Sequence, residues 1–222
     1  MIIWVASFPR SGNSFVMSLL WSLYECRTSS VFDETGYIDE RKLYAMYGYE
    51  KLTFAKFAYW MHDQKPHFVK THNACVDSLP AIYVIRDGRD TLVSLAHFSI
   101  AQKRVETNFE DTLRDCIVVR GFSWSRRVLW WTKKRASFAP TIAVKYEDLI
   151  RAPVITLYFA LRRLNISSDK TGTPISFETL HNIEPTQYRS GKVGTWRTEM
   201  SKANQKLFWQ LHGNAMRELG YD

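Results

Sequence analysis

The sequence predicts an α/β fold in three layers, with a parallel β-sheet flanked by helices on both faces. Short apolar, β-branched runs alternate with helical patterns along the chain, which is typical of strands joined by helical crossovers. Apolar residues make up 45% of the 222 residues, which is enough for a sizeable core. The length suits one domain covering residues 1–222, and we find no internal repeat.

The first unit of this pattern is a strand, a tight loop and a helix. Residues 2–8 form an apolar run that predicts a buried strand. The chain breaks at Pro9 and Gly12, and a helical spacing of apolar residues begins at Ser14. Such a loop exposes backbone N–H groups at a helix N-terminus, which favours an anion. Its serines and asparagine are also ordinary cap residues, so the loop alone leaves a plain connection equally open.

The remaining elements follow in order. Strands are expected at 67–72, 81–85 and 141–146, and helices at 91–104, 113–135, 153–164 and 202–219, with a short helix after Ser176. Segment 41–63 is rich in aromatic residues, which favours helices packed on the sheet over a wall of a ligand pocket. Residues 184–198 carry two glycines and three cations. This composition predicts a mobile, irregular loop that covers a negatively charged group.

Polar or cationic side chains follow the carboxyl ends of the predicted strands. They are Arg10, Lys70, His72, Arg86 and Tyr146. In open parallel sheets, ligands bind at this edge. Each residue alone is weak support, but their shared position predicts one ligand site.

The charge balance favours an anionic ligand, an anionic polymer or a membrane surface. Thirty Lys and Arg against 22 Asp and Glu give a net charge of +8, and no long basic block points to nucleic acid. Cys26, Cys75 and Cys116 are too widely spaced to suggest a zinc site or a disulfide framework. Since we see no signal peptide or membrane span, we expect a cytoplasmic protein.

Six segments carry motifs whose order matches one known family. They are residues 8–15, Lys70-Thr71-His72, residues 85–94, Tyr146-Glu147-Asp148, Ser176-Phe177 and residues 189–196. In this set the chain resembles the sulfotransferases that use 3′-phosphoadenosine 5′-phosphosulfate (PAPS). Segment 8–15 is similar to the family's 5′-phosphosulfate loop, and segment 85–94 to its 3′-phosphate motif. The resemblance reaches from residue 8 to residue 197 and implies a P-loop-like sulfotransferase fold.

The resemblance implies a PAPS site drawn from the whole chain. Its cofactor-binding residues would be Arg10, Ser11, Gly12, Asn13, Ser14, Phe15, Arg86, Ser94, Tyr146, Phe177, Arg189, Ser190 and Gly191. The helix start at Gly12 suits the 5′ end of the nucleotide. Arg86, Ser94 and Arg189 would hold the 3′-phosphate. Phe15, Tyr146 and Phe177 would pack around the adenine, and the alternative is that these three residues pack in the protein core.

The implied reaction transfers a sulfuryl group from PAPS to a hydroxyl or amine of a small-molecule acceptor and leaves 3′-phosphoadenosine 5′-phosphate (PAP). His72 would take the acceptor proton, and Arg10 would stabilise the leaving phosphate. Lys70 would either assist at the transferred group or be a solvated lysine at a strand end. No metal is needed, and no cluster of metal ligands supplies one. We expect no nucleic acid partner, and we leave a homodimer and the identity of the acceptor open.

The chain departs from the family pattern at five positions. Arg10, Asn13, Ile175, Ser190 and Thr195 stand where the family commonly has Lys, Thr, Thr, Lys and Asp. Arg10 keeps the positive charge but does not readily release a proton, which suits electrostatic stabilisation better than acid catalysis. We expect the cofactor site to survive these changes, with its affinity left open.

Two other functions compete with this interpretation. A P-loop-like kinase using ATP and Mg²⁺ would share the strand-loop-helix unit, but the motif G-x-x-x-x-G-K-S/T lacks its first glycine and its lysine here. A binding module for sulfated or phosphorylated polymers is compatible with the charge of +8. The spread of basic residues along the chain weighs against such a module.

Overall fold

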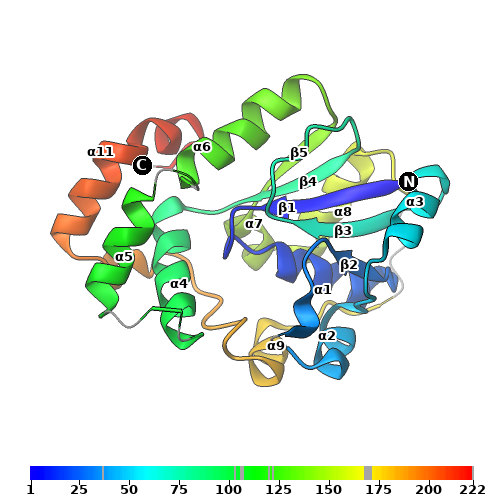
Figure 1. The fold of residues 1–222 in the computed structure, drawn as a ribbon, viewed down its shortest axis with the longest axis horizontal. Helices are drawn as coiled ribbons and strands as arrows, with labels where there is room; N and C mark the ends of the chain where they lie inside the picture. Colours follow the sequence, from blue (N-terminus) through cyan, green and yellow to red (C-terminus); the bar gives the residue numbers. More distant parts are fainter. Residues whose placement is uncertain are drawn as a thin grey trace.

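The computed structural model describes residues 1–36, 38–102, 104–105, 108–119, 121, 123–167 and 172–221. Within these ranges, the centre is a five-stranded sheet in the order β2-β3-β1-β4-β5 (Figure 1). The strands are β1 (Ile2–Ser7), β2 (Thr28–Ser30), β3 (His67–Thr71), β4 (Ala81–Ile85) and β5 (Thr141–Lys145). Each pairing is parallel, so the carboxyl ends lie along one edge, and the predicted class is confirmed.

Alternation along the central strand β1 explains the three layers. Ile3 and Val5 belong to one buried apolar cluster, whereas Ile2, Trp4 and Ala6 belong to the other. Because both faces of β1 are covered, its side chains are apolar without the polar alternation of a solvent-facing strand.

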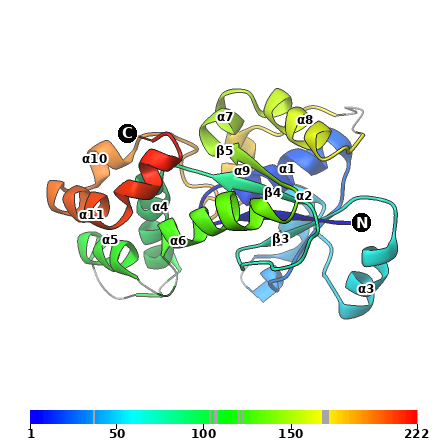
Figure 2. The same ribbon diagram turned by 90° about the horizontal axis from the view of Figure 1, so that it is seen from above.

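Helices cover the two faces of the sheet (Figure 2). The first cluster is completed by α1 (Asn13–Tyr24), α2 (Glu40–Tyr47), α7 (Tyr146–Arg151), α8 (Pro153–Arg163) and α9 (Phe177–Ile183). The second is completed by α3 (Phe54–His62), α4 (Gly88–Ala101), α5 (Phe109–Val118), α6 (Trp124–Leu129), α10 (Trp196–Glu199) and α11 (Lys202–Glu218). Between α9 and α11 the chain therefore crosses from one helical layer to the other. None of the helices in the described ranges is long and apolar enough to cross a membrane.

Three expectations about the elements are wrong, each for a local reason. The edge strand β2 was not expected, because its Thr and Ser residues look like a loop although they are buried. The helix expected at 113–135 is instead α5 and α6, with Gly121 between them and a π-helical turn at Trp130–Lys134. Tyr146 does not end a strand but begins α7 directly after β5.

Candidate active site

A cavity lies at the carboxyl edge of the sheet, where the predicted site residues meet. Those that line it are Arg10, Gly12, Asn13, Ser14, Phe15, Lys70, His72, Arg86, Ser94, Tyr146, Phe177, Arg189, Ser190 and Gly191. Ser11 is buried and does not line it. The shared position at the strand ends thus brings together residues from the first loop to the last.

The loop between β1 and α1 has a conformation that only glycine permits at its centre. Gly12 has a φ of 108° and is the N-cap of α1, where no side chain caps the helix. A Cβ atom at Gly12 would lie 2.5 Å from the Tyr146 ring, which a real side chain cannot do. The Ser11 Oγ and the Asn13 Nδ2 are buried without a hydrogen-bond partner. An uncapped helix start beside unpartnered polar atoms suits an anion.

Three arginines surround the same part of the cavity. Arg86 stacks its guanidinium 4.4 Å from the centroid of the Tyr146 ring and donates from one terminal nitrogen to the Arg10 carbonyl oxygen at 3.2 Å. The Nε atoms of Arg86 and Arg189 are both buried and unpartnered. Buried donors without acceptors are costly unless a ligand satisfies them. Their charge indicates that this ligand is an anion.

Arg10 joins the first loop to the late part of the chain. Its Nε donates to the Ser94 Oγ at 3.3 Å, and a terminal nitrogen donates to the Gln187 carbonyl at 2.7 Å. The guanidinium also lies 4.6 Å from the centroid of the Phe98 ring. Burial, together with the charge of Arg86, lowers the pKa of Arg10 to about 10, so it is still protonated at neutral pH.

His72 is oriented to accept a proton from the cavity. Its Nδ1 lies 2.9 Å from the Ser7 carbonyl oxygen, which can only accept, so Nδ1 carries the hydrogen and Nε2 keeps a lone pair. The ring stacks on Phe32 with centroids 5.6 Å apart. Burial, reinforced by the nearby charge of Lys70, lowers the pKa of His72 to about 3. The imidazole is therefore neutral at pH 7, which is the form that a general base requires.

Lys70 is not a solvated lysine at a strand end. Its Nζ lies 2.7 Å from the Glu34 carboxylate and 3.2 Å from the Ser14 Oγ, and both charged side chains are buried. Glu34 also lines the cavity, and no motif in the sequence signals it, because it lies in a polar stretch. A buried pair of this kind holds the ammonium beside the start of α1, and the loss of one partner would leave the other charge uncompensated.

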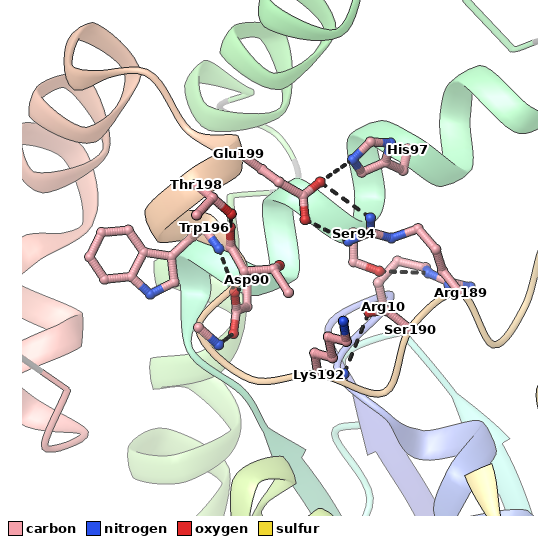
Figure 3. A network of polar contacts seen from close by, with 12 residues as sticks. Arg10, Asp90, Ser94, His97, Arg189, Ser190, Lys192, Trp196, Thr198 and Glu199 are labelled. Atoms are coloured by element: carbon pink, nitrogen blue, oxygen red, sulfur yellow. Dashed lines mark hydrogen bonds and ion pairs between the residues drawn. The ribbon is translucent and has the colours of Figure 1, made fainter. Parts of the chain in front are cut away.

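The late segment, residues 186–199, is held against α4 by two carboxylates (Figure 3). Asp90 accepts hydrogen bonds from the backbone of Gly194 at 2.6 Å and Trp196 at 3.0 Å. Glu199 takes both terminal nitrogens of Arg189, at 3.2 and 3.1 Å, and is also hydrogen-bonded to His97. Burial raises the pKa of Glu199, but these hydrogen bonds outweigh burial and hold it below its usual value. The irregular path expected for residues 184–198 is confirmed as far as Thr195, whereas residues 196–199 form α10. The segment is tied to the rest of the protein at several points, and the mobility expected for it stays a prediction.

Several lining residues were not identified from the sequence. They are Pro9, Phe32, Glu34, Leu95, Phe98, Arg104, Gln187 and Tyr188. Two of them, Leu95 and Phe98, follow Ser94 on α4, and that adjacency was the available signal. Segment 41–63 contains α2 and α3, as expected, and its aromatic residues do not line this cavity. Among the described residues, no group of three or more His, Cys, Asp or Glu could hold a metal ion.

Comparison with known proteins identifies the class. A family model described as the sulfotransferase domain matches residues 2–220, so the chain belongs to the sulfotransferase domain family and is a transferase enzyme of that class. Human sulfotransferase 1E1 is 24% identical over 255 aligned positions, which cover 96% of this chain and 83% of the relative.

Solved structures show the same fold. Mouse sulfotransferase SULT7A1, solved in complex with PAP, matches with a TM-score of 0.68 at 17% identity over 99% of this chain and 86% of its own. Retinol dehydratase, solved with androsterone and the inactive cofactor PAP, matches with a TM-score of 0.61 at 18% identity over 98% and 81%. The P-loop-like sulfotransferase fold implied by the motifs is therefore confirmed.

Proposed function

We propose that this enzyme transfers the sulfuryl group of PAPS to a hydroxyl or amine of a small-molecule acceptor and releases PAP. One observation carries the proposal. Unpartnered buried donors belong to Asn13, Arg86 and Arg189, which line one cavity, and a neutral histidine whose Nε2 keeps a lone pair lines the same cavity. The PAP that is present in the two structural relatives has the two separated anionic groups that such donors would satisfy.

The residues fit the nucleotide in two places. The start of α1 and the Lys70 ammonium would hold its 5′ end, and Arg86, Arg189 and Ser94 its 3′-phosphate. Phe15 and Phe177 lie with ring centroids 6.1 Å apart and would pack at the adenine, while Tyr146 supports the guanidinium of Arg86. A Cβ atom at Gly191 would lie 2.7 Å from the Phe177 ring, so only glycine allows the backbone at residue 191 to pack this closely against that ring.

The chemistry then depends on charge placed before the reaction begins. Bound PAPS supplies the sulfuryl group. The Nε2 atom of His72 takes the proton from the hydroxyl or amine of the acceptor molecule. The Ser7 carbonyl oxygen, which already accepts the hydrogen bond from Nδ1, stabilises the imidazolium that forms. Arg10 and Lys70 provide fixed positive charge for the leaving phosphate, which requires positioning and electrostatic stabilisation rather than covalent catalysis.

Calorimetric titration with PAP tests the nucleotide assignment, with ADP and with ATP plus Mg²⁺ as controls. We expect PAP to bind at least about tenfold more tightly than ADP, because a charge-assisted contact to the 3′-phosphate contributes about 1.5–3 kcal/mol. A preference for ATP plus Mg²⁺ would support the kinase, and no binding of any nucleotide would support the polymer-binding module.

An activity screen tests the reaction itself. We expect PAPS to support transfer to at least one member of a panel of alcohols, phenols and amines, with the same rate when EDTA is present. The EDTA arm tests the expectation that no metal is needed. The single domain, the cytoplasmic location and a homodimer stay predictions, which size-exclusion chromatography and cell fractionation can address.

A further inference from the structure

One face of α4 holds the late segment directly at two points, and at a third point it binds Arg10, which in turn donates to the Gln187 carbonyl. Asp90, Ser94 and His97 are spaced four and three positions apart, so they lie on one side of the helix. Asp90 binds the backbone of residues 194–196, Ser94 accepts from Arg10, and His97 is hydrogen-bonded to Glu199 (Figure 3).

Glu199, the last residue of α10, links this face of α4 to Arg189 at the cavity. Its Oε1 lies 3.1 Å from one terminal nitrogen of Arg189, and its Oε2 lies 3.2 Å from the other. The same Oε2 is bound to the His97 Nε2, one turn beyond Ser94. One carboxylate therefore connects Arg189 to His97 of α4, the helix that also carries Ser94. The proposed function assigns Arg189 and Ser94 to the same phosphate.

We propose that Glu199 is a positioning residue that presets Arg189 for the 3′-phosphate of the nucleotide, an inference that rests on the proposed function. An arginine has five N–H donors, and Glu199 occupies the two terminal nitrogens from one side. The Arg189 Nε remains buried, unpartnered and beside the cavity. The carboxylate thus fixes the orientation of the guanidinium and leaves donors for the phosphate.

The benefit of Glu199 is the order that it imposes on a long side chain. The Arg189 side chain is 32% exposed, so without its partner it would be free to turn into solvent. Binding the phosphate would then have to immobilise it, which lowers affinity by about tenfold or less. The opposite reading is that the carboxylate competes with the phosphate for Arg189, and it predicts tighter binding when Glu199 is removed.

Calorimetric titration of the full chain separates these readings, in buffer free of phosphate and sulfate. The ligands are PAP and adenosine 5′-monophosphate, which lacks the 3′-phosphate. We expect Glu199→Ala to weaken PAP about tenfold and to leave the monophosphate within twofold of wild type. Glu199→Gln should lose about threefold, because its carbonyl oxygen still accepts one hydrogen bond. Glu218→Gln is the matched control, since Glu218 is exposed and does not line the cavity.

A double-mutant cycle with Arg189→Ala supplies the decisive comparison. In that background Glu199→Ala should have no further effect on PAP, because its partner is gone. Equal losses for both nucleotides, tighter PAP binding, or additive losses in the cycle would each overturn the positioning role. If wild type does not prefer PAP to the monophosphate, the proposed function fails and this inference falls with it. If wild type prefers PAP but the Glu199 variants match it, only the positioning role fails.

Discussion

The two segments that face the nucleotide side of the cavity, residues 9–15 and 186–199, are built in opposite ways. The first is a short backbone turn that follows the central strand, with Gly12 at a φ of 108°, and the first residues of α1. The second is irregular and is held by side chains of α4 and by Arg10. A substitution at the centre of the backbone turn should weaken nucleotide binding strongly. The late segment is held by several side chains, so the loss of one of them should weaken binding less.

The largest effect is expected outside both segments, at the histidine. His72→Ala should lower turnover by about 10²–10⁴-fold, because general base catalysis contributes that much. PAP affinity should stay within twofold, since the histidine is assigned to the acceptor and not to the nucleotide. Steady-state assays with PAPS and the best acceptor from the screen, together with calorimetry, measure both quantities. The exposed His62 provides a matched control as His62→Ala. Turnover near that of wild type would remove His72 from the mechanism.

The next largest effect tests the rigid segment. Gly12→Ala should weaken PAP binding by about ten- to a hundredfold, because a positive φ costs alanine about 1–3 kcal/mol and the free turn would relax to a geometry that binding must reverse. The new methyl group would also displace the Tyr146 ring. Gly36→Ala is the control, since a Cβ atom there meets nothing within 4 Å. Wild-type affinity in Gly12→Ala would show that the turn is not specific to glycine.

A smaller effect on binding is expected when the late segment is released. Asp90→Ala removes the acceptor of the Gly194 and Trp196 amides and should lower the unfolding free energy by about 1–3 kcal/mol. PAP affinity should fall only several-fold, because Arg10 and Glu199 still hold the segment. Hydrogen exchange at both amides should accelerate, whereas the exposed Asp115→Ala should change neither. A loss of PAP binding as large as in Gly12→Ala would break the contrast between the segments.

The last effect concerns pH. His72 has a pKa of about 3 in the folded protein and about 6.5 when unfolded, so between these values the unfolded chain binds more protons. Stability should therefore fall as the pH drops below about 6.5. Urea unfolding at pH 7 and pH 5 should show a smaller loss in His72→Gln than in wild type. Equal losses of unfolding free energy in the two proteins would contradict the lowered pKa. The same conclusion would follow if the activity of wild type had an inflection near pH 6.5 that His72→Gln lacks.

The sequence predicted the first segment better than the late one, for a physical reason. The strand, the turn at Gly12 and the helix follow from contacts between residues that are close in the chain, which local periodicity records. The role of Glu199 depends on His97 and Arg189 meeting it in space, and no spacing within α10 signals that meeting. The polar β2 strand was missed likewise, because its burial depends on β3 and on the segment around residue 49 rather than on its own residues.

The sequence by itself determined the α/β class, most of the strands and helices, the sulfotransferase motifs and about two thirds of the residues that line the cavity. These follow from apolar periodicity and from residues placed at the ends of parallel strands. Only the tertiary structure decided the tautomer of His72, the buried pair of Lys70 with Glu34 and the attachment of Arg189 to Glu199. Each of these depends on a partner brought near by folding, since charge state and hydrogen bonding are set by the surroundings of a group and not by its neighbours in the chain.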